Sequence, residues 1–347
     1  MQNRTYITAL GIDYSKGEFI VFIQGLNFSN IAKQEGSSGL QQAAPMFIGQ
    51  EKAKSIQAAF SKLEQNTALP LYYGHIRTII LSKNVIKKHL NSVIEYMGEN
   101  PFLRYNCWLF GTKEDVKEII LGESFFNYPS LYSIIHNPEP LFKENFIIPI
   151  EKYNRFISKY YQTVGSYVIP SISIKKDQFF NNKKPSNINS LDGGFVIGQQ
   201  QYKGWVKKQD LTGLKWFSKQ ASTIPLSLFK EKVSVIIRKP KGLIKVLNGS
   251  KPTYDLFVKA KAILVQNEEN MSVNKIQKEL ALKIKREIVK TINKSGEIHA
   301  DLLNMSEKPY RYKHSKWDIQ TLNSMDKSLI KDIIVKIKIV ENASYKK

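Results

Sequence analysis

The side chains best suited to nucleophilic chemistry or metal binding in this 347-residue chain are one cysteine and five histidines. Zinc sites draw three or four ligands from His, Cys and acidic residues at short spacings. No pair of these histidines has the i, i+4 spacing of a helical metal site, and no carboxylate cluster accompanies them. They are His75, His89, His136, His299 and His314. We therefore predict no metal site and no cofactor.

Cys107 is the only cysteine, so no intramolecular disulfide can form. It begins the apolar run Cys107-Trp108-Leu109-Phe110. A reactive thiol needs exposure and an electropositive setting that lowers its pKa. The apolar neighbours favour a small buried core residue over a nucleophile.

Three short segments resemble parts of catalytic motifs. Asp192-Gly193-Gly194 and Gly111-Thr112-Lys113 lack the full Gly-rich pattern that places Lys and Ser or Thr at a helix start, so they predict turns. Glu268-Glu269 lies in a polar loop, which does not indicate general acid–base catalysis. A wall-polymer hydrolase would need a cleft with paired acids, which the sequence does not indicate. We predict no catalytic residues and no enzymatic activity.

The charge of the chain is the strongest indication of its partners. It carries 52 Lys and Arg against 30 Asp and Glu, a net charge of +22. Residues 191–347 hold 31 of the basic and 15 of the acidic residues. Such a charge attracts anionic phospholipid, anionic wall polymer or nucleic acid. Aromatic residues are not interleaved with the basic ones along 273–292, which disfavours single-stranded nucleic acid.

The elements that would position these residues predict an α+β (mixed α/β), multi-domain chain. Residues 1–122 predict an N-terminal α/β domain. Its expected strands are 6–12 and 19–23 (a hairpin), 78–81 and 105–110; its expected helices are 51–65, 84–97 (capped by Gly98) and 113–121; residues 33–42 are an expected loop.

Residues 123–190 predict a middle segment or small second domain, with a helix over 151–164, a strand over 167–174 and a polar linker at 181–190. Residues 191–347 predict a basic α+β domain of antiparallel strands and covering helices. Its expected strands are 195–202, 204–206, 233–238 and 243–247 (a hairpin across Pro240-Lys241-Gly242), 254–265 and 333–340; its expected helices are 212–219 and 273–292.

The segment 273–292 is the most regular helical pattern in the chain. Its apolar stripe is Val273, Ile276, Leu280, Ile284, Ile288 and Ile292, and Gly296 is expected to end the helix. Lys275, Lys278, Lys285, Arg286 and Lys290 lie off the stripe. They predict either a solvated outer face or a surface turned toward a membrane or nucleic acid.

No run in the chain has the roughly 18 uninterrupted apolar residues of a membrane helix. The start of the chain does not have the pattern of a signal peptide before Arg4.

Short segments spread over nearly the whole chain resemble the Ger(x)C family of spore germination proteins in their order and spacing. They are Thr8–Asp13 with Gly17-Glu18-Phe19, Ile31–Gly36, Tyr73-Gly74-His75 with Ile79–Ser82, Arg104-Tyr105 with Trp108–Thr112, Leu191-Asp192-Gly193, Tyr202-Lys203-Gly204, Asp210–Trp216, Lys259-Ala260, and Tyr310-Arg311-Tyr312 with Trp317.

The resemblance implies an elongated, multi-domain lipoprotein with mixed or antiparallel sheets, flanked by helices. It implies a non-enzymatic C subunit of a nutrient germinant receptor, at the outer face of the spore inner membrane. Its partners would be the membrane-embedded A and B subunits and the anionic membrane surface, with no nucleic acid and no metal. The signal peptide and lipid-bearing cysteine implied by the family would precede Arg4; Cys107 lies in a strand-like segment and cannot replace that cysteine. The alternative is a basic nucleic-acid-binding or anionic-polymer-binding protein.

Overall fold

The computed structural model describes residues 5–26, 46–124, 128, 130–144, 148–181, 183–313 and 316–342. The chain folds as two compact units. The N-terminal unit takes residues 1–138, 150–159 and 169–195, and the C-terminal unit takes residues 139–149, 160–168 and 196–347. Mixed sheets with flanking helices confirm the α+β class. The three-part division at residues 122 and 190 stays a prediction, and the loop expected over 33–42 lies outside the described residues.

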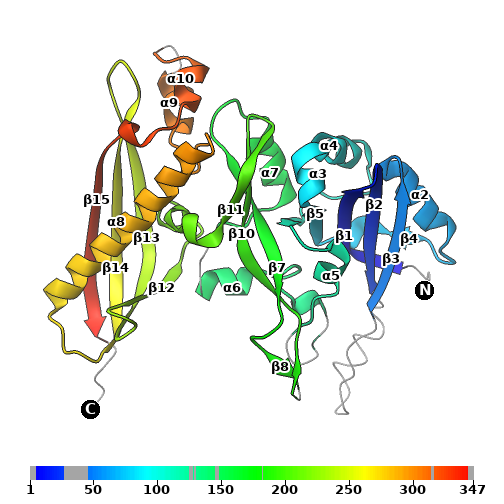
Figure 1. The fold of residues 1–347 in the computed structure, drawn as a ribbon, viewed down its shortest axis with the longest axis horizontal. Helices are drawn as coiled ribbons and strands as arrows, with labels where there is room; N and C mark the ends of the chain where they lie inside the picture. The colour runs from blue at the N-terminus through cyan, green and yellow to red at the C-terminus, as the bar shows by residue number, and fades with distance from the viewer. Residues whose placement is uncertain are drawn as a thin grey trace. The chain divides into compact units, whose positions relative to one another are not determined.

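The sheet of the N-terminal unit runs in the order β10-β7-β6-β5-β1-β2-β3, with β4 also paired to β1 (Figure 1). The pairs β1–β5, β5–β6 and β6–β7 are parallel, whereas β1–β2 and β2–β3 are antiparallel. The strands are β1 Thr5–Ser15, β2 Glu18–Leu26, β3 Met46–Ala53, β4 Leu71–Tyr72, β5 Thr78–Ser82, β6 Trp108–Thr112, β7 Tyr167–Lys175 and β10 Ile188–Gly198. The short strands β8 Phe180–Asn181 and β9 Lys184–Pro185 form a separate ladder, in the segment where the sequence predicts a linker.

Helices cover both faces of this sheet, as expected for a layered α/β arrangement. They are α2 Ile56–Gln65, α3 Lys83–Lys88, α4 Leu90–Glu99, α5 Val116–Ile120 and α7 Tyr153–Tyr160, with the 3₁₀ turns η1 Tyr73–His75 and η3 Ser130–Tyr132. A Cβ added to Gly11 would lie 2.5 Å from Val116 and 2.9 Å from Ile120, so this glycine lets α5 approach β1 closely. Leu63 of α2 packs near Gly49 and Ile23, on the opposite face of the sheet.

The expected helix 84–97 is interrupted. Its two parts, α3 and α4, meet at His89, whose φ of −131° is outside the helical range. The His89 ring packs against Tyr14, with ring centroids 3.7 Å apart, and against Phe19. The expected helix 51–65 begins only at Ile56, because Ser55 caps it and Ala53 still belongs to β3. These boundaries depend on contacts between elements, and the hydrophobic periodicity of a single segment does not predict such contacts.

A buried polar group lies inside the N-terminal unit. The Nε2 atom of His136 lies 2.7 Å from the side-chain oxygen of Gln24, which also accepts a hydrogen bond of 2.9 Å from the Thr8 hydroxyl. The Gln24 amide nitrogen donates to the Ile120 carbonyl. Because the Gln24 oxygen accepts, the hydrogen of the neutral imidazole lies on Nε2. Desolvation by burial, with a smaller contribution from the Arg77 charge, lowers the pKa of His136 from 6.5 to about 3.

We expect His136 to make the N-terminal unit sensitive to acid. The unfolded chain takes up a proton near pH 6.5 and the folded one only near pH 3, so stability is lost as pH falls between those values. The free energy of unfolding should be about 2 kcal/mol lower at pH 5 than at pH 7 from this group alone. Guanidinium denaturation followed by circular dichroism across this range measures the slope. A His136→Gln variant should flatten the slope, and an unchanged slope would assign it to other groups.

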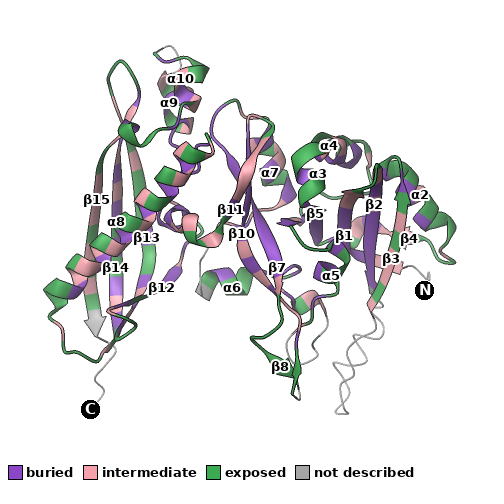
Figure 2. Cartoon of the chain, viewed as in Figure 1, coloured by how far each residue is buried: buried purple, intermediate pink, exposed green. Residues whose placement is uncertain are grey.

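The C-terminal unit contains a sheet in the order β12-β13-β14-β15 (Figure 1). Its strands are β12 Thr223–Leu228, β13 Val233–Leu247, β14 Thr253–Asn267 and β15 Ile330–Asn342. The helix α8, Val273–Glu297, packs on one face of this sheet. Leu256 and Val258 of β14 and Ile284 and Ile288 of the helix are buried, and Figure 2 shows buried segments along both elements. Other elements of this unit are α6 Glu139–Glu144, β11 Gln201–Lys207, η4 Lys208–Asp210, η5 Thr212–Trp216, α9 Glu307–Lys313, α10 Ile319–Asn323 and η6 Lys327–Leu329.

Three expectations for this unit are corrected. The hairpin expected across Pro240-Lys241-Gly242 is a single long strand, because β13 accommodates this segment as a bulge where the register shifts between Arg238 and Lys241. β15 is parallel to β14 rather than antiparallel, because the connection through α8 returns the chain to the edge of the sheet at which β14 begins. Helix α8 continues through Gly296 to Glu297.

Candidate functional site

Cys107 is a core residue, as the sequence predicts. It is fully buried, and its Sγ lies 3.3 Å from the Arg104 carbonyl. Desolvation by burial raises the pKa of its thiol to about 12. A thiol with this pKa holds its proton at neutral pH and is a poor nucleophile.

Three of the described histidines have separate partners. His75 packs against Tyr6, His89 against Tyr14, and His136 is bound to Gln24. His314 lies outside the described residues. Within the described part of the chain, no three His, Cys, Asp or Glu side chains gather in a way that could hold a metal ion. Nor does any described helix have the length and apolar character needed to cross a membrane.

The segments that resemble catalytic motifs have structural contacts instead. Asp192 forms an ion pair with Lys113 at 3.4 Å. Gly111 is needed for packing, because an added Cβ would lie 2.5 Å from the Phe195 ring. Glu269 pairs with Lys232, on an exposed part of the β13 and β14 ends. The turns predicted for the two glycine segments are therefore wrong, because Gly111 and Thr112 end strand β6 and Asp192-Gly193-Gly194 lies within strand β10. Glu268-Glu269 lies in a turn after β14, as the sequence predicts.

A buried polar cluster joins η5 to helix α8. Lys215 is only 7% exposed, and its Nζ lies 3.0 Å from a carboxylate oxygen of Glu287. The same oxygen accepts a hydrogen bond of 2.9 Å from the indole N–H of Trp216. The Thr291 hydroxyl donates to the Asp210 carbonyl and accepts from the Gly213 amide. The segment Asp210–Trp216, which is among those that resemble the family, therefore attaches η5 to helix α8.

The basic helix expected over 273–292 has most of its predicted apolar stripe in the core, but Val273 at its start is 45% exposed. Ile276, Leu280, Ile284 and Ile288 are all fully buried. Lys275, Lys278, Lys285, Arg286 and Lys290 are exposed on the outer side. Lys290 forms a 3.0 Å ion pair with Asp210. The arrangement is that of an amphipathic helix covering a sheet, with a basic side available to solvent or to an anionic partner.

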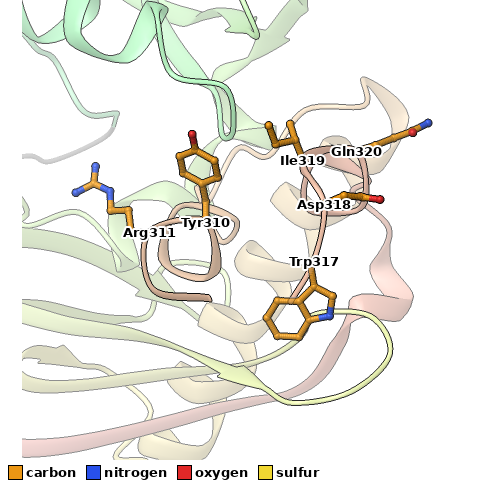
Figure 3. A pocket seen from close by; sticks show the side chains of 6 residues that line it. All are labelled: Tyr310, Arg311, Trp317, Asp318, Ile319 and Gln320. Carbon is orange, nitrogen blue, oxygen red and sulfur yellow. The ribbon is translucent and has the colours of Figure 1, made fainter. Parts of the chain in front are cut away.

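A hollow of the C-terminal unit lies between α9 and α10 (Figure 3). It is an open depression of about 790 Å³, lined by Tyr310, Arg311, Trp317, Asp318, Ile319 and Gln320. Figure 3 shows the Tyr310 and Ile319 side chains near each other and the Arg311 side chain pointing away from them. Tyr310 and Trp317 belong to a segment singled out in the sequence, but the hollow itself was not predicted.

The floor of this hollow is firmly held. Trp317 is 5% exposed and packs with Val164, Leu322 and Tyr310. Asp318 accepts a 2.6 Å hydrogen bond from the Thr321 amide at the start of α10, and this bond holds the pKa of the carboxyl below its usual value. An aromatic floor with a capping carboxylate can bind a side chain or ligand by contact. The carboxylate is committed to capping the helix rather than to proton transfer.

These features define a chain whose prominent polar groups stabilise the fold, with a basic C-terminal unit and a shallow aromatic hollow. Sequence models of two spore germination domains match it: the spore germination protein N-terminal domain over residues 1–174, and the spore germination B3/GerAC-like C-terminal domain over residues 192–342. The chain belongs to the Ger(x)C family of spore germination proteins.

Individual relatives agree with this membership. The chain is 19% identical over 321 residues to YfkR of Bacillus subtilis (strain 168), a protein assigned to spore germination, and the match spans 88% of this chain and 81% of YfkR. The crystal structure of the GerBC protein superposes with a TM-score of 0.57, covering 98% of this chain and 99% of GerBC at 16% identity. At that identity the superposition shows a common fold.

Proposed function

We propose that this protein is the C subunit of a spore nutrient germinant receptor. In this proposal it is a lipoprotein anchored at the outer face of the spore inner membrane, where it takes part in receptor assembly or signalling beside the membrane-embedded A and B subunits. The observation that carries the proposal is the match of both family domains, which take in residues 1–174 and 192–342.

The subunit acts by binding rather than by catalysis. The side chains best able to react have structural roles instead: the Cys107 thiol is buried, and Glu287 neutralises Lys215. The net charge of +22 favours a position beside an anionic membrane. A single lipid chain holds a protein at a membrane only marginally, and added positive charge strengthens that binding.

A deletion strain tests the role. Spores that lack this chain should lose the response to the matching nutrient and keep germination by a receptor-independent trigger. Reintroducing the wild-type gene should restore the response. A Cys107→Ala gene should restore it equally, because the thiol takes no part in chemistry. A normal nutrient response in the deletion strain contradicts the proposal, and failure of Cys107→Ala in a folded protein contradicts its non-catalytic part.

A further inference from the structure

Six cations lie side by side on one face of the C-terminal sheet. The strand register places Lys241, Lys259 and Lys336 next to one another across β13, β14 and β15. The adjacent row, two residues further along β14, is Arg238, Lys261 and Lys338. We call these six residues the basic sheet face. With strands about 4.8 Å apart, three neighbouring positions span only about 10 Å.

This face is turned away from helix α8. Along β14 the residues that face α8, such as Val258 and Ala260, are buried, and the alternate residues Lys259 and Lys261 are exposed. All six cations are exposed. Arg238 donates a hydrogen bond to the Thr223 hydroxyl, and no ion pair with a described acidic residue involves any of the six.

An apolar row borders the basic one. Leu243, Phe257 and Ile334 are neighbours across the same three strands and on the same face. Leu243 is 55% exposed, and the other two are half-buried. Beyond this apolar row, Lys245, Asp255 and Asp332 are neighbours across the same three strands. The face thus has a row of mixed charge, an apolar row and then the two rows of the basic sheet face.

Like charges directly opposite each other destabilise a sheet. The strands could hold threonine or a pair of opposite charges at these positions without this cost. A dense anionic surface would remove the repulsion, and it would also attract each lysine. The placement therefore indicates an anionic partner for this face.

We propose that the basic sheet face binds the headgroups of anionic phospholipids and lays the C-terminal unit against the membrane; this inference rests on the proposed function at the spore membrane. Lipid suits the face better than the other anionic partners. Lysine is depleted from the cores of protein interfaces. Nucleic acid offers phosphates but no apolar layer beside them, whereas a bilayer offers headgroups for Lys259 and Lys336 and an acyl boundary for Leu243.

Vesicle binding of the complete chain tests the proposal. The sheet-face variant replaces Lys259, Lys261, Lys336 and Lys338 with glutamine. The matched control replaces Lys275, Lys278, Lys285 and Arg286 with glutamine; it removes the same charge from the outer side of α8, which points away from the basic sheet face. The probes are phosphatidylcholine vesicles with and without about one third phosphatidylglycerol, analysed by sedimentation.

Wild type should bind the anionic vesicles only. Each lysine near an anionic surface contributes about fivefold to binding, so the sheet-face variant should lose roughly several hundredfold in partition coefficient. The control variant should lose about tenfold or less, through its lower net charge. The thermal midpoint of the sheet-face variant should equal or exceed that of wild type, because like-charge pairs are removed.

Three results would overturn the proposal: no binding of wild type to anionic vesicles, equal losses in the two variants, or tighter binding to double-stranded DNA that only the sheet-face variant loses. The last result would assign the face to nucleic acid. The outcome is separable from the proposed function. A deletion strain that germinates normally refutes the receptor role and leaves vesicle binding intact, whereas failed vesicle binding refutes the lipid-binding face and leaves the deletion phenotype intact.

Discussion

Replacing Glu287 with alanine is expected to destabilise the C-terminal unit by about 3–5 kcal/mol, the usual cost of leaving a buried charge without its partner. The Lys215 ammonium lies 3.0 Å from Glu287 and its side chain is 9% exposed, so water cannot replace the lost carboxylate. The indole N–H of Trp216 loses its acceptor in the same variant. Both losses fall on the contact between η5 and α8.

Two further variants separate these contributions. Glu287→Gln keeps an oxygen for the Trp216 N–H but removes the negative charge, so it should fall between wild type and Glu287→Ala. Combining Glu287→Gln with Lys215→Met removes the unpaired cation and should recover most of the stability. If the double variant is no more stable than Glu287→Gln alone, the charge pair is not what Glu287 contributes.

Guanidinium denaturation followed by tryptophan fluorescence measures these effects. Trp205, Trp216 and Trp317 belong to the C-terminal unit, whereas Trp108 belongs to the other one. The fluorescence change therefore reports mainly on the unit that carries the substitutions. A chain with more than one compact unit need not unfold in a single step, so a two-state fit is applied to each observed transition rather than to the whole chain.

Replacing Gly242 with alanine is expected to cost about 3 kcal/mol or more, at the upper end of what overpacking causes. A Cβ on Gly242 would overlap the Trp216 carbonyl oxygen and lie 2.9 Å from the Phe217 Cα. These are backbone atoms, which cannot turn away as the end of a side chain can. Either β13 or the end of η5 must shift, and a shift of η5 strains the Lys215–Glu287 pair.

Gly296→Ala provides the matched control for this substitution. Gly296 lies within α8, and an added Cβ there would come no closer than 3.8 Å to the Met325 carbonyl. Alanine is favoured over glycine inside a helix, so this variant should gain about 0.5–1 kcal/mol. The same denaturation experiment compares the two. A Gly242→Ala protein as stable as wild type would show that η5 moves freely over β13.

The elements with strong periodicity could be predicted from the sequence. The hairpin of β1 and β2, the strand at 78–81 and the start of helix α8 match their expected positions. Errors arose where a contact between distant residues determines a boundary. His89 packs on Tyr14 and divides one expected helix. Gly242 packs against the Trp216 backbone within a continuous β13, where the sequence predicts a hairpin.

The candidate site residues could likewise be predicted only where a local pattern was sufficient. The structural role of Cys107 followed from its apolar neighbours, because a local run predicts burial. The hollow at Tyr310 and Trp317 could not be predicted, because Trp317 is held by packing against Val164, about 150 residues earlier in the chain. The charge of the C-terminal half was evident, but its distribution over surfaces was not.

The amino-acid sequence by itself determined the α+β class, the periodic elements, the positive charge and the resemblance to the Ger(x)C family. Only the tertiary structure decided that Lys241, Lys259 and Lys336 are neighbours and that Lys215 meets Glu287. The physical reason is that alternation along a strand assigns a side chain to a face, whereas the neighbours on that face depend on strand pairing. Pairing and register are set by contacts between segments far apart in the chain.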